Sequence, residues 1–88
     1  MYEAVQFIEV EGVADPVQTI LGEFSSESPA VELVRTTRSA FVESGAEDYA
    51  WWVVRQQGAT LAEFIADSKS DKEFVLDLSS GELVEVTT

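Results

Sequence analysis

The sequence predicts an α+β fold of two layers, in which helices cover one face of a mixed four-stranded sheet in the order β-α-α-β-α-β-β. Apolar residues recur with a helical period in some segments and alternate or run continuously in others, and glycine or proline marks many of the boundaries. The 88 residues suffice for one domain, residues 1–88, with a thin core.

The first half of the chain predicts a strand and a helix. Residues 2–11, YEAVQFIEVE, form the expected strand, which ends before Gly12. A short helix is expected within residues 14–24, ADPVQTILGEF, because Pro16 suits the first turn. Its apolar side chains repeat at helical spacing. They are Val17, Ile20, Leu21 and Phe24.

A second helix is expected between Ser28 as N-cap and Gly45 as C-cap, and a second strand follows at residues 49–56, YAWWVVRQ. Arg35 and Arg38 fall on the solvent-exposed side of this helix. The opposite side carries the residues that we expect to pack on the sheet. They are Ala30, Leu33, Val34, Thr37, Ala40 and Phe41.

The last third of the chain predicts a third helix and a β-hairpin. The helix covers residues 61–68, LAEFIADS, after a capping box formed by Thr60 and Glu63. The hairpin pairs residues 73–78 with residues 82–86 across an SSG turn.

Two adjacent tryptophans, Trp51 and Trp52, lie in the strand 49–56. Successive side chains of a strand point to opposite faces, so the two indoles cannot enter the same core. Both faces of this strand are apolar, which is typical of strands covered on both sides. We therefore expect one tryptophan on the sheet face that the helices leave open. Which of the two lies there depends on the strand register.

The open face is expected to form an apolar docking patch of several hundred Å² with an acidic rim, as at protein interfaces. The candidate interface residues are Trp51, Trp52, Val5, Phe7, Val75, Leu83, Glu9 and Glu85. In one alternative a helix crosses to the far side, and a three-layer fold buries both tryptophans. In another the same residues line a small-molecule pocket.

The net charge of −12, from 17 acidic and five basic residues, limits the possible partners. Direct binding to nucleic acid or to an anionic membrane is disfavoured, because both need a basic surface. No apolar run approaches the ~20 residues that span a bilayer. We expect a cytoplasmic protein. The acidity and the scarcity of lysine also fit a halophilic composition.

The chain has no cysteine and no histidine, so thiolate chemistry and imidazole bases are excluded. The remaining motifs are weak. Lys69 lies among serines in a polar loop, and Glu47–Asp48 are adjacent acids before a strand. Asp67 and Asp71 have calcium-loop spacing, but Lys69 occupies a ligand position between them. We expect no cofactor, no metal site and no enzyme activity.

The function expected from these features is a small, acidic, non-enzymatic protein-binding module that docks through the open apolar sheet face. We expect it to form a homodimer through this face, and another protein is the other partner considered. One alternative is an acidic decoy that occupies the basic groove of a nucleic-acid-binding protein. It needs clustered acids, and Glu9, Glu11, Glu82 and Glu85 cluster if the first and last strands are neighbours. The other alternative is a small enzyme or ligand carrier that uses carboxylates.

The acidic composition generates a prediction about salt. Raising NaCl from about 0.1 M to about 1 M shortens the screening length from ~10 Å to ~3 Å, so repulsion among the acids should fall and the Tm should rise. Thermal unfolding followed by circular dichroism measures this change. An unchanged Tm would contradict halophilic adaptation.

Overall fold

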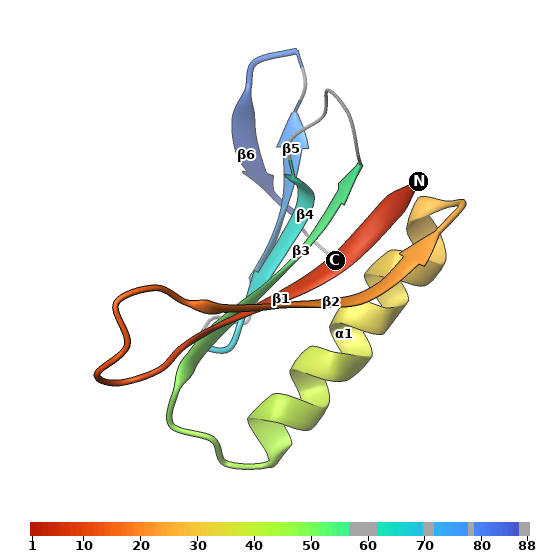
Figure 1. Ribbon diagram of the computed structural model, residues 1–88. Helices are drawn as coiled ribbons and strands as arrows, with labels where there is room; N and C mark the ends of the chain where they lie inside the picture. Colours follow the sequence, from red (N-terminus) through yellow and green to blue (C-terminus); the bar gives the residue numbers. More distant parts are fainter. Residues whose placement is uncertain (57–61, 70–71, 78, 87–88) are drawn as a thin grey trace.

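A single antiparallel sheet forms most of the protein, with one helix packed on one of its faces (Figure 1). The computed structural model describes residues 1–56, 62–69, 72–77 and 79–86. The strands and the helix in this part of the chain are β1 (Tyr2–Glu9), β2 (Val17–Phe24), α1 (Glu27–Glu43), β3 (Tyr49–Gln56), β4 (Ala62–Asp67), β5 (Glu73–Asp77) and β6 (Glu82–Glu85).

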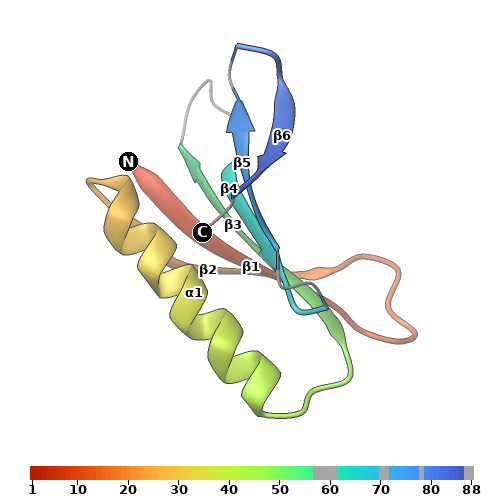
Figure 2. The same ribbon diagram turned by 180° about the vertical axis from the view of Figure 1, so that it is seen from behind.

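The strands follow the order β2-β1-β3-β4-β5-β6 across the sheet, and every neighbouring pair is antiparallel. The chain returns from the edge strand β2 through α1 to β3, on the other side of β1. Helix α1 packs over β1, β2, β3 and β4, and the β5–β6 hairpin extends away from it (Figures 1 and 2). The opposite face of the sheet carries no helix from the described chain.

The predicted mixed four-stranded sheet with several helices, in the order β-α-α-β-α-β-β, is therefore wrong. The described chain contains a six-stranded sheet and one helix. The segment expected as the first helix forms β2, and most of the segment expected as the third helix forms β4. Both errors have a physical cause in the spacing of apolar residues.

A β-bulge in β2 explains the first error. Consecutive residues of β1 pair with Gly22 and Ile20, so Leu21 is an extra residue in β2. The bulge puts Val17 and Phe24 on the same side of the sheet although they lie an odd number of positions, seven, apart in the sequence. A regular strand does not allow this spacing, whereas two turns of a helix do. The bulged strand therefore imitates an amphipathic helix.

In β4, two adjacent apolar residues were misassigned to one helical stripe. Phe64 is 3% exposed in the core under α1, while Ile65 pairs with Val53 on the other face. The alternation of Phe64 and Ala66, both buried, is the signal that a strand is present. The capping-box residue Thr60 lies outside the described residues.

The prediction of helix α1 is confirmed, with a different first residue. The N-cap is Ser26 rather than Ser28, and the C-cap is Ser44. Gly45 follows with φ +74°, a conformation that favours glycine, and its N–H donates to the Val42 carbonyl at 3.2 Å. Of the predicted apolar stripe, Ala30 and Val34 are fully buried, and Ala40 is exposed.

The strand 49–56 and the terminal hairpin are also confirmed. Strand β1 ends two residues earlier than expected, at Glu9. In the turn between β5 and β6, Gly81 has φ +72° and its N–H donates to the Asp77 carbonyl at 2.7 Å.

Trp52 is the largest fully buried side chain in the described core. Its Nε1–H donates to Oε1 of Gln6 at 3.0 Å, and its ring meets Phe41 of α1 edge-on at 5.5 Å between centroids. The buried residues around it include four alanines, whose small side chains leave room for the indole. These neighbours are Ala4, Ala30, Val34, Ala50, Val54, Phe64 and Ala66.

The two arginines of α1 connect the helix to the sheet. The Nε and Nη2 atoms of Arg35 donate to the two carboxylate oxygens of Glu73 in β5, at 3.1 and 2.9 Å. The guanidinium carbon of Arg35 also lies 5.4 Å from the centroid of the Phe64 ring. Nε of Arg38 donates to the Asp67 carbonyl at 2.6 Å. The helix is thereby attached to β4 and β5.

Replacing Trp52 by alanine should lower the free energy of unfolding by about 3–5 kcal/mol, because it leaves a large cavity between β3 and α1. Replacing Trp51, on the other face, should cost about 1–2 kcal/mol, since its ring is partly exposed. Urea unfolding measures both values, and the remaining tryptophan reports fluorescence in each variant. Equal losses would show that Trp51 is as much a core residue as Trp52.

Candidate functional site

The pleat of β3 separates its two tryptophans. Trp52 points toward α1 and is 0% exposed, so it is a core residue that a partner cannot reach. Trp51 points to the opposite side and is partly exposed. We call this opposite side the helix-free face. Because α1 packs on the other side only, the three-layer alternative with helices on both faces is not observed in the described chain.

Strand register places a row of side chains across the helix-free face, because residues paired between neighbouring strands point to the same side. This row begins on β2 and ends on β6. It consists of Ile20, Val5, Val53, Ile65, Phe74 and Glu85. A second row joins Phe7 of β1, Trp51 of β3 and Asp67 of β4.

Six of the eight candidate interface residues lie on the helix-free face. They are Val5, Phe7, Glu9, Trp51, Leu83 and Glu85. Trp52 and Val75 lie on the other face, since Val75 pairs with the core residue Phe64. Phe74 and Leu76 of β5 take the place expected for Val75. Apolar residues occur on both faces of β5, so a one-residue change of assignment exchanges Val75 for Phe74 and Leu76.

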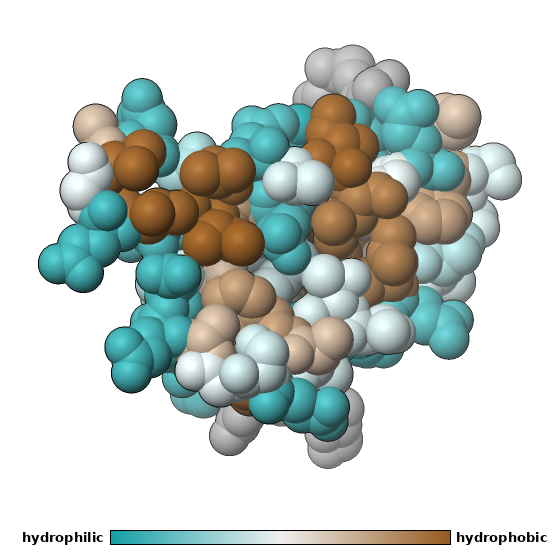
Figure 3. Space-filling view, turned by 60° about the horizontal axis from the view of Figure 1, so that its bottom comes forward, coloured by the Kyte–Doolittle hydropathy of each residue, from teal (hydrophilic) through white to brown (hydrophobic). Residues whose placement is uncertain are grey.

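The centre of the helix-free face is buried rather than exposed. Val5 is 0% and Val53 7% exposed, and both lie in the middle of the row. Exposed apolar side chains lie around them, with Leu83 at 50%. On the surface seen from below Figure 1, apolar side chains also form separate groups with hydrophilic ones between them (Figure 3). The exposed apolar side chains of the helix-free face are therefore separated by buried ones.

Trp51 is the centre of an aromatic cluster on the helix-free face. Its ring stacks on Phe7 with centroids 5.2 Å apart and an interplanar angle of 8°. Tyr49, two residues earlier on β3, lies 5.7 Å from Trp51 at an angle of 42°. We define the aromatic cluster as Phe7, Tyr49 and Trp51. Its stacking fixes the orientation of the Trp51 ring in the absence of a partner.

A hollow of about 380 Å³ lies beside this cluster. We call it the Trp51 hollow. It is lined by Glu9, Tyr49, Trp51, Ile65 and Asp67. Tyr49 forms a side-chain hydrogen bond with Asp67, and desolvation, Asp67 and Glu9 together raise the pKa of the Tyr49 phenol above its ordinary value of 10.0. The carboxylates of Asp67 and Glu9 therefore both act on the phenol of Tyr49, which lines the same hollow.

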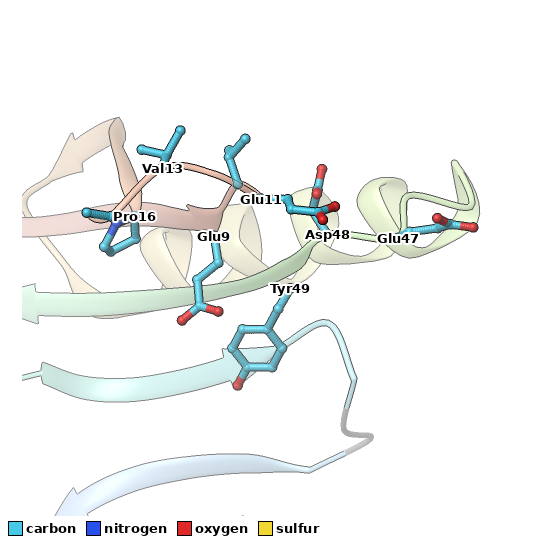
Figure 4. Close-up of a pocket in the computed structure, with 9 residues that line it drawn as sticks. Glu9, Glu11, Val13, Pro16, Glu47, Asp48 and Tyr49 are labelled. Atoms are coloured by element: carbon cyan, nitrogen blue, oxygen red, sulfur yellow. The ribbon is translucent and has the colours of Figure 1, made fainter.

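A second hollow, of about 550 Å³, lies where the β1–β2 loop meets the loop between α1 and β3. Its lining includes the carboxylates of Glu9, Glu11, Glu47 and Asp48. In Figure 4, the side chains of Glu9 and Tyr49 point together to one side of the sheet, toward β4, away from the carboxylates of Glu47 and Asp48. Glu9 is shared by the two hollows. One end of the molecule is thus strongly anionic.

The acidic cluster expected from adjacent first and last strands does not form, because β3, β4 and β5 separate β1 from β6. No group of three acidic side chains in the described residues is arranged to hold a metal ion. In the loop with calcium-type spacing, Asp67 accepts the N–H of Lys69 at 3.0 Å. Asp71 lies outside the described residues.

All five basic residues contact oxygen atoms of the chain. Arg35 and Arg38 do so from α1, and Arg55 lies 3.5 Å from the buried carboxylate of Glu3. Nζ of Lys69 donates to the Glu47 carbonyl at 3.3 Å, and Nζ of Lys72 lies 3.7 Å from Glu85. With 17 acids, most carboxylates have no positive charge of the chain to neutralise them.

The sequence interpretation missed Tyr49, Ile65 and Asp67 as lining residues. Tyr49 was recoverable, because it shares a strand face with Trp51. Ile65 and Asp67 cannot be placed in the hollow from the sequence, because the apolar spacing of residues 61–68 predicts a helix.

Among the described residues, α1 is the one helix, and it lacks the length and apolar character needed to span a membrane. Comparisons with protein-family models, curated proteins and solved structures found no significant match to this chain.

The Tyr49 phenol should titrate above pH 10, later than a free tyrosine. Because the folded state holds this proton more tightly, its contribution to stability is present below pH 10 and is lost as pH rises through the raised pKa. The difference in absorbance at about 295 nm between the wild type and Tyr49→Phe isolates this titration. Asp67→Asn should move it to lower pH. No movement would show that Asp67 does not act on Tyr49.

Proposed function

We propose that this protein is a non-enzymatic binding module that docks a basic protein partner onto its helix-free face. The observation that carries the proposal is the position of Trp51, partly exposed on that face and held in place by Phe7 and Tyr49. Tryptophan and tyrosine are the residues most often found as interface hot spots. An aromatic anchor that is oriented before binding also loses little conformational entropy when it binds.

The surroundings of Trp51 support a protein interface. Apolar side chains lie beside it, and Glu9, Asp67 and Glu85 lie on the same face. Acidic side chains beside a partly exposed aromatic anchor resemble the polar surround of hot-spot residues at protein–protein interfaces. The expected compartment of such a module is the cytoplasm, in keeping with a chain that has no cysteine.

Charge favours a basic partner over a second copy of the chain. Each copy carries −12, and its five basic residues already contact oxygen atoms within the chain. Two copies joined through this face would bring Glu9 and Asp67 of one near the acids of the other, and like charges at an interface cost several kcal/mol. Sedimentation should therefore show a monomer. A dimer that Trp51→Ala dissociates would instead identify a second copy as the occupant.

The test of this proposal maps the face that meets the partner. A photo-crosslinking amino acid at position 83, on the helix-free face, should capture a basic protein from cell extract. The same amino acid at position 39, on the exposed side of α1, is the matched control. The captured protein is then purified, and Trp51→Ala should weaken its binding at least ~30-fold, as expected for a hot spot of ~2 kcal/mol. Equal capture from both positions, or unchanged affinity, would contradict the proposal.

The acidic decoy is a second candidate, and the four carboxylates around the larger hollow support it. A decoy acts through many charges, so its affinity should fall steeply with salt and respond to Glu11→Gln and Asp48→Asn. A module anchored by Trp51 should lose little affinity with salt and respond mainly to Trp51→Ala. Titrating the captured partner at about 0.1 M and about 0.5 M NaCl separates the two.

A further inference from the structure

The Trp51 hollow combines aromatic rings with carboxylates in one depression of the helix-free face. Trp51 and Tyr49 supply two rings inclined at 42°, and Glu9 and Asp67 supply two carboxylates. A cation is attracted both by the face of an aromatic ring and by a carboxylate. Among the described residues that line the hollow, none is basic. The hollow is therefore complementary to a positively charged side chain.

The same protein already holds an arginine with this combination of groups. On the other side of the sheet, the guanidinium of Arg35 lies 5.4 Å from the Phe64 ring centroid and forms two hydrogen bonds with Glu73. A ring on one strand and a carboxylate on the neighbouring strand thus contact the same guanidinium. In the Trp51 hollow, the ring of Trp51 lies on β3, and Glu9 ends the neighbouring strand β1.

We propose that the Trp51 hollow binds one arginine side chain of the basic partner, with its guanidinium against Trp51 and Tyr49 and its N–H groups donating to Glu9. This proposal rests on the proposed docking function and names the chemistry of the contact. We assign Glu9 as the acceptor of the guanidinium N–H groups, since Asp67 already makes two hydrogen bonds within the chain. It accepts the Lys69 N–H at 3.0 Å and is hydrogen-bonded to the Tyr49 phenol. Asp67 thus positions the tyrosine ring.

The geometry favours arginine over the other cations found in proteins. A guanidinium is planar, stacks on an aromatic face and donates two parallel hydrogen bonds to a carboxylate. The lysine ammonium is more strongly hydrated and donates no fork of bonds, so it gains less from the same two groups. A quaternary ammonium has no N–H and leaves the acceptor capacity of Glu9 unused.

The test uses the full chain and three short peptides, acetyl-Gly-X-Gly-amide with X as arginine, lysine or citrulline. Binding is followed by ¹H–¹⁵N spectra at about 0.15 M salt. The Trp51 indole N–H signal should shift saturably with the arginine peptide, with a Kd in the millimolar range. The Trp52 indole, buried and bonded to Gln6, is the internal control and should stay in place. The lysine peptide should bind about threefold or more weakly, and citrulline should not bind.

Two variants with the same change of charge locate the contact. Glu9→Gln should weaken the affinity for the arginine peptide about threefold or more. Glu11→Gln removes an equal charge in the neighbouring loop and should change that affinity less than about 1.5-fold. Trp51→Leu should abolish binding, and an unmoved Trp52 indole signal would show that this variant is folded.

Three results would overturn the proposal. These are equal binding of arginine and lysine peptides, equal weakening by Glu9→Gln and Glu11→Gln, and a Trp51 signal that does not move. The first two would indicate general attraction to the acidic end. Because the assay needs no natural partner, such a result leaves the docking function standing if Trp51→Ala still releases the captured protein. Conversely, loss of the docking function does not alter the peptide result.

Discussion

Burial of Trp52 between β3 and α1 is the constraint on which the other features depend. The indole fills the space between the sheet and the helix, and four alanines around it keep that space open. Its N–H is bonded to Gln6 of the neighbouring strand β1, so the ring position also fixes how β1 and β3 pair. Once Trp52 points inward, the pleat forces Trp51 outward. The exposed aromatic cluster is therefore a direct consequence of how the core is built.

The sequence predicted the parts of the fold in which one periodicity dominates. Helix α1 has apolar residues at helical spacing, of which Ala30 and Val34 are fully buried, and β3 lies between clear boundaries. Strands β2 and β4 were missed because a bulge at Leu21 and two-sided burial at Phe64 and Ile65 produce helical spacing in extended chain. For the site, pleat geometry alone predicts that the two tryptophans point to opposite faces. The Trp51 hollow is not predictable in this way, because Ile65 and Asp67 line it only when β4 pairs with β3.

The distribution of charge gives the helix-free face its chemical character. The five cations are used within the chain, two of them to attach α1 to β4 and β5. Four of the remaining carboxylates, those of Glu9, Glu11, Glu47 and Asp48, gather at the end of the molecule where β1 and β3 meet the loops, and Glu9 belongs to both hollows there. In the proposed docking, a basic partner would meet this negative potential first and the aromatic cluster afterwards. Attraction at long range and recognition at short range are thus supplied by neighbouring groups.

The strand order determines where one copy of the protein could pair with another through its sheet edges. The sheet does not close, so β2 and β6 are both edge strands, and β2 displays Val17 and Ile20 to solvent. Such edges are templates for fibril growth unless something repels an incoming strand. Here Glu23 on β2 and Glu82 on β6 place negative charge along the two edges, which opposes the approach of a strand from a second copy.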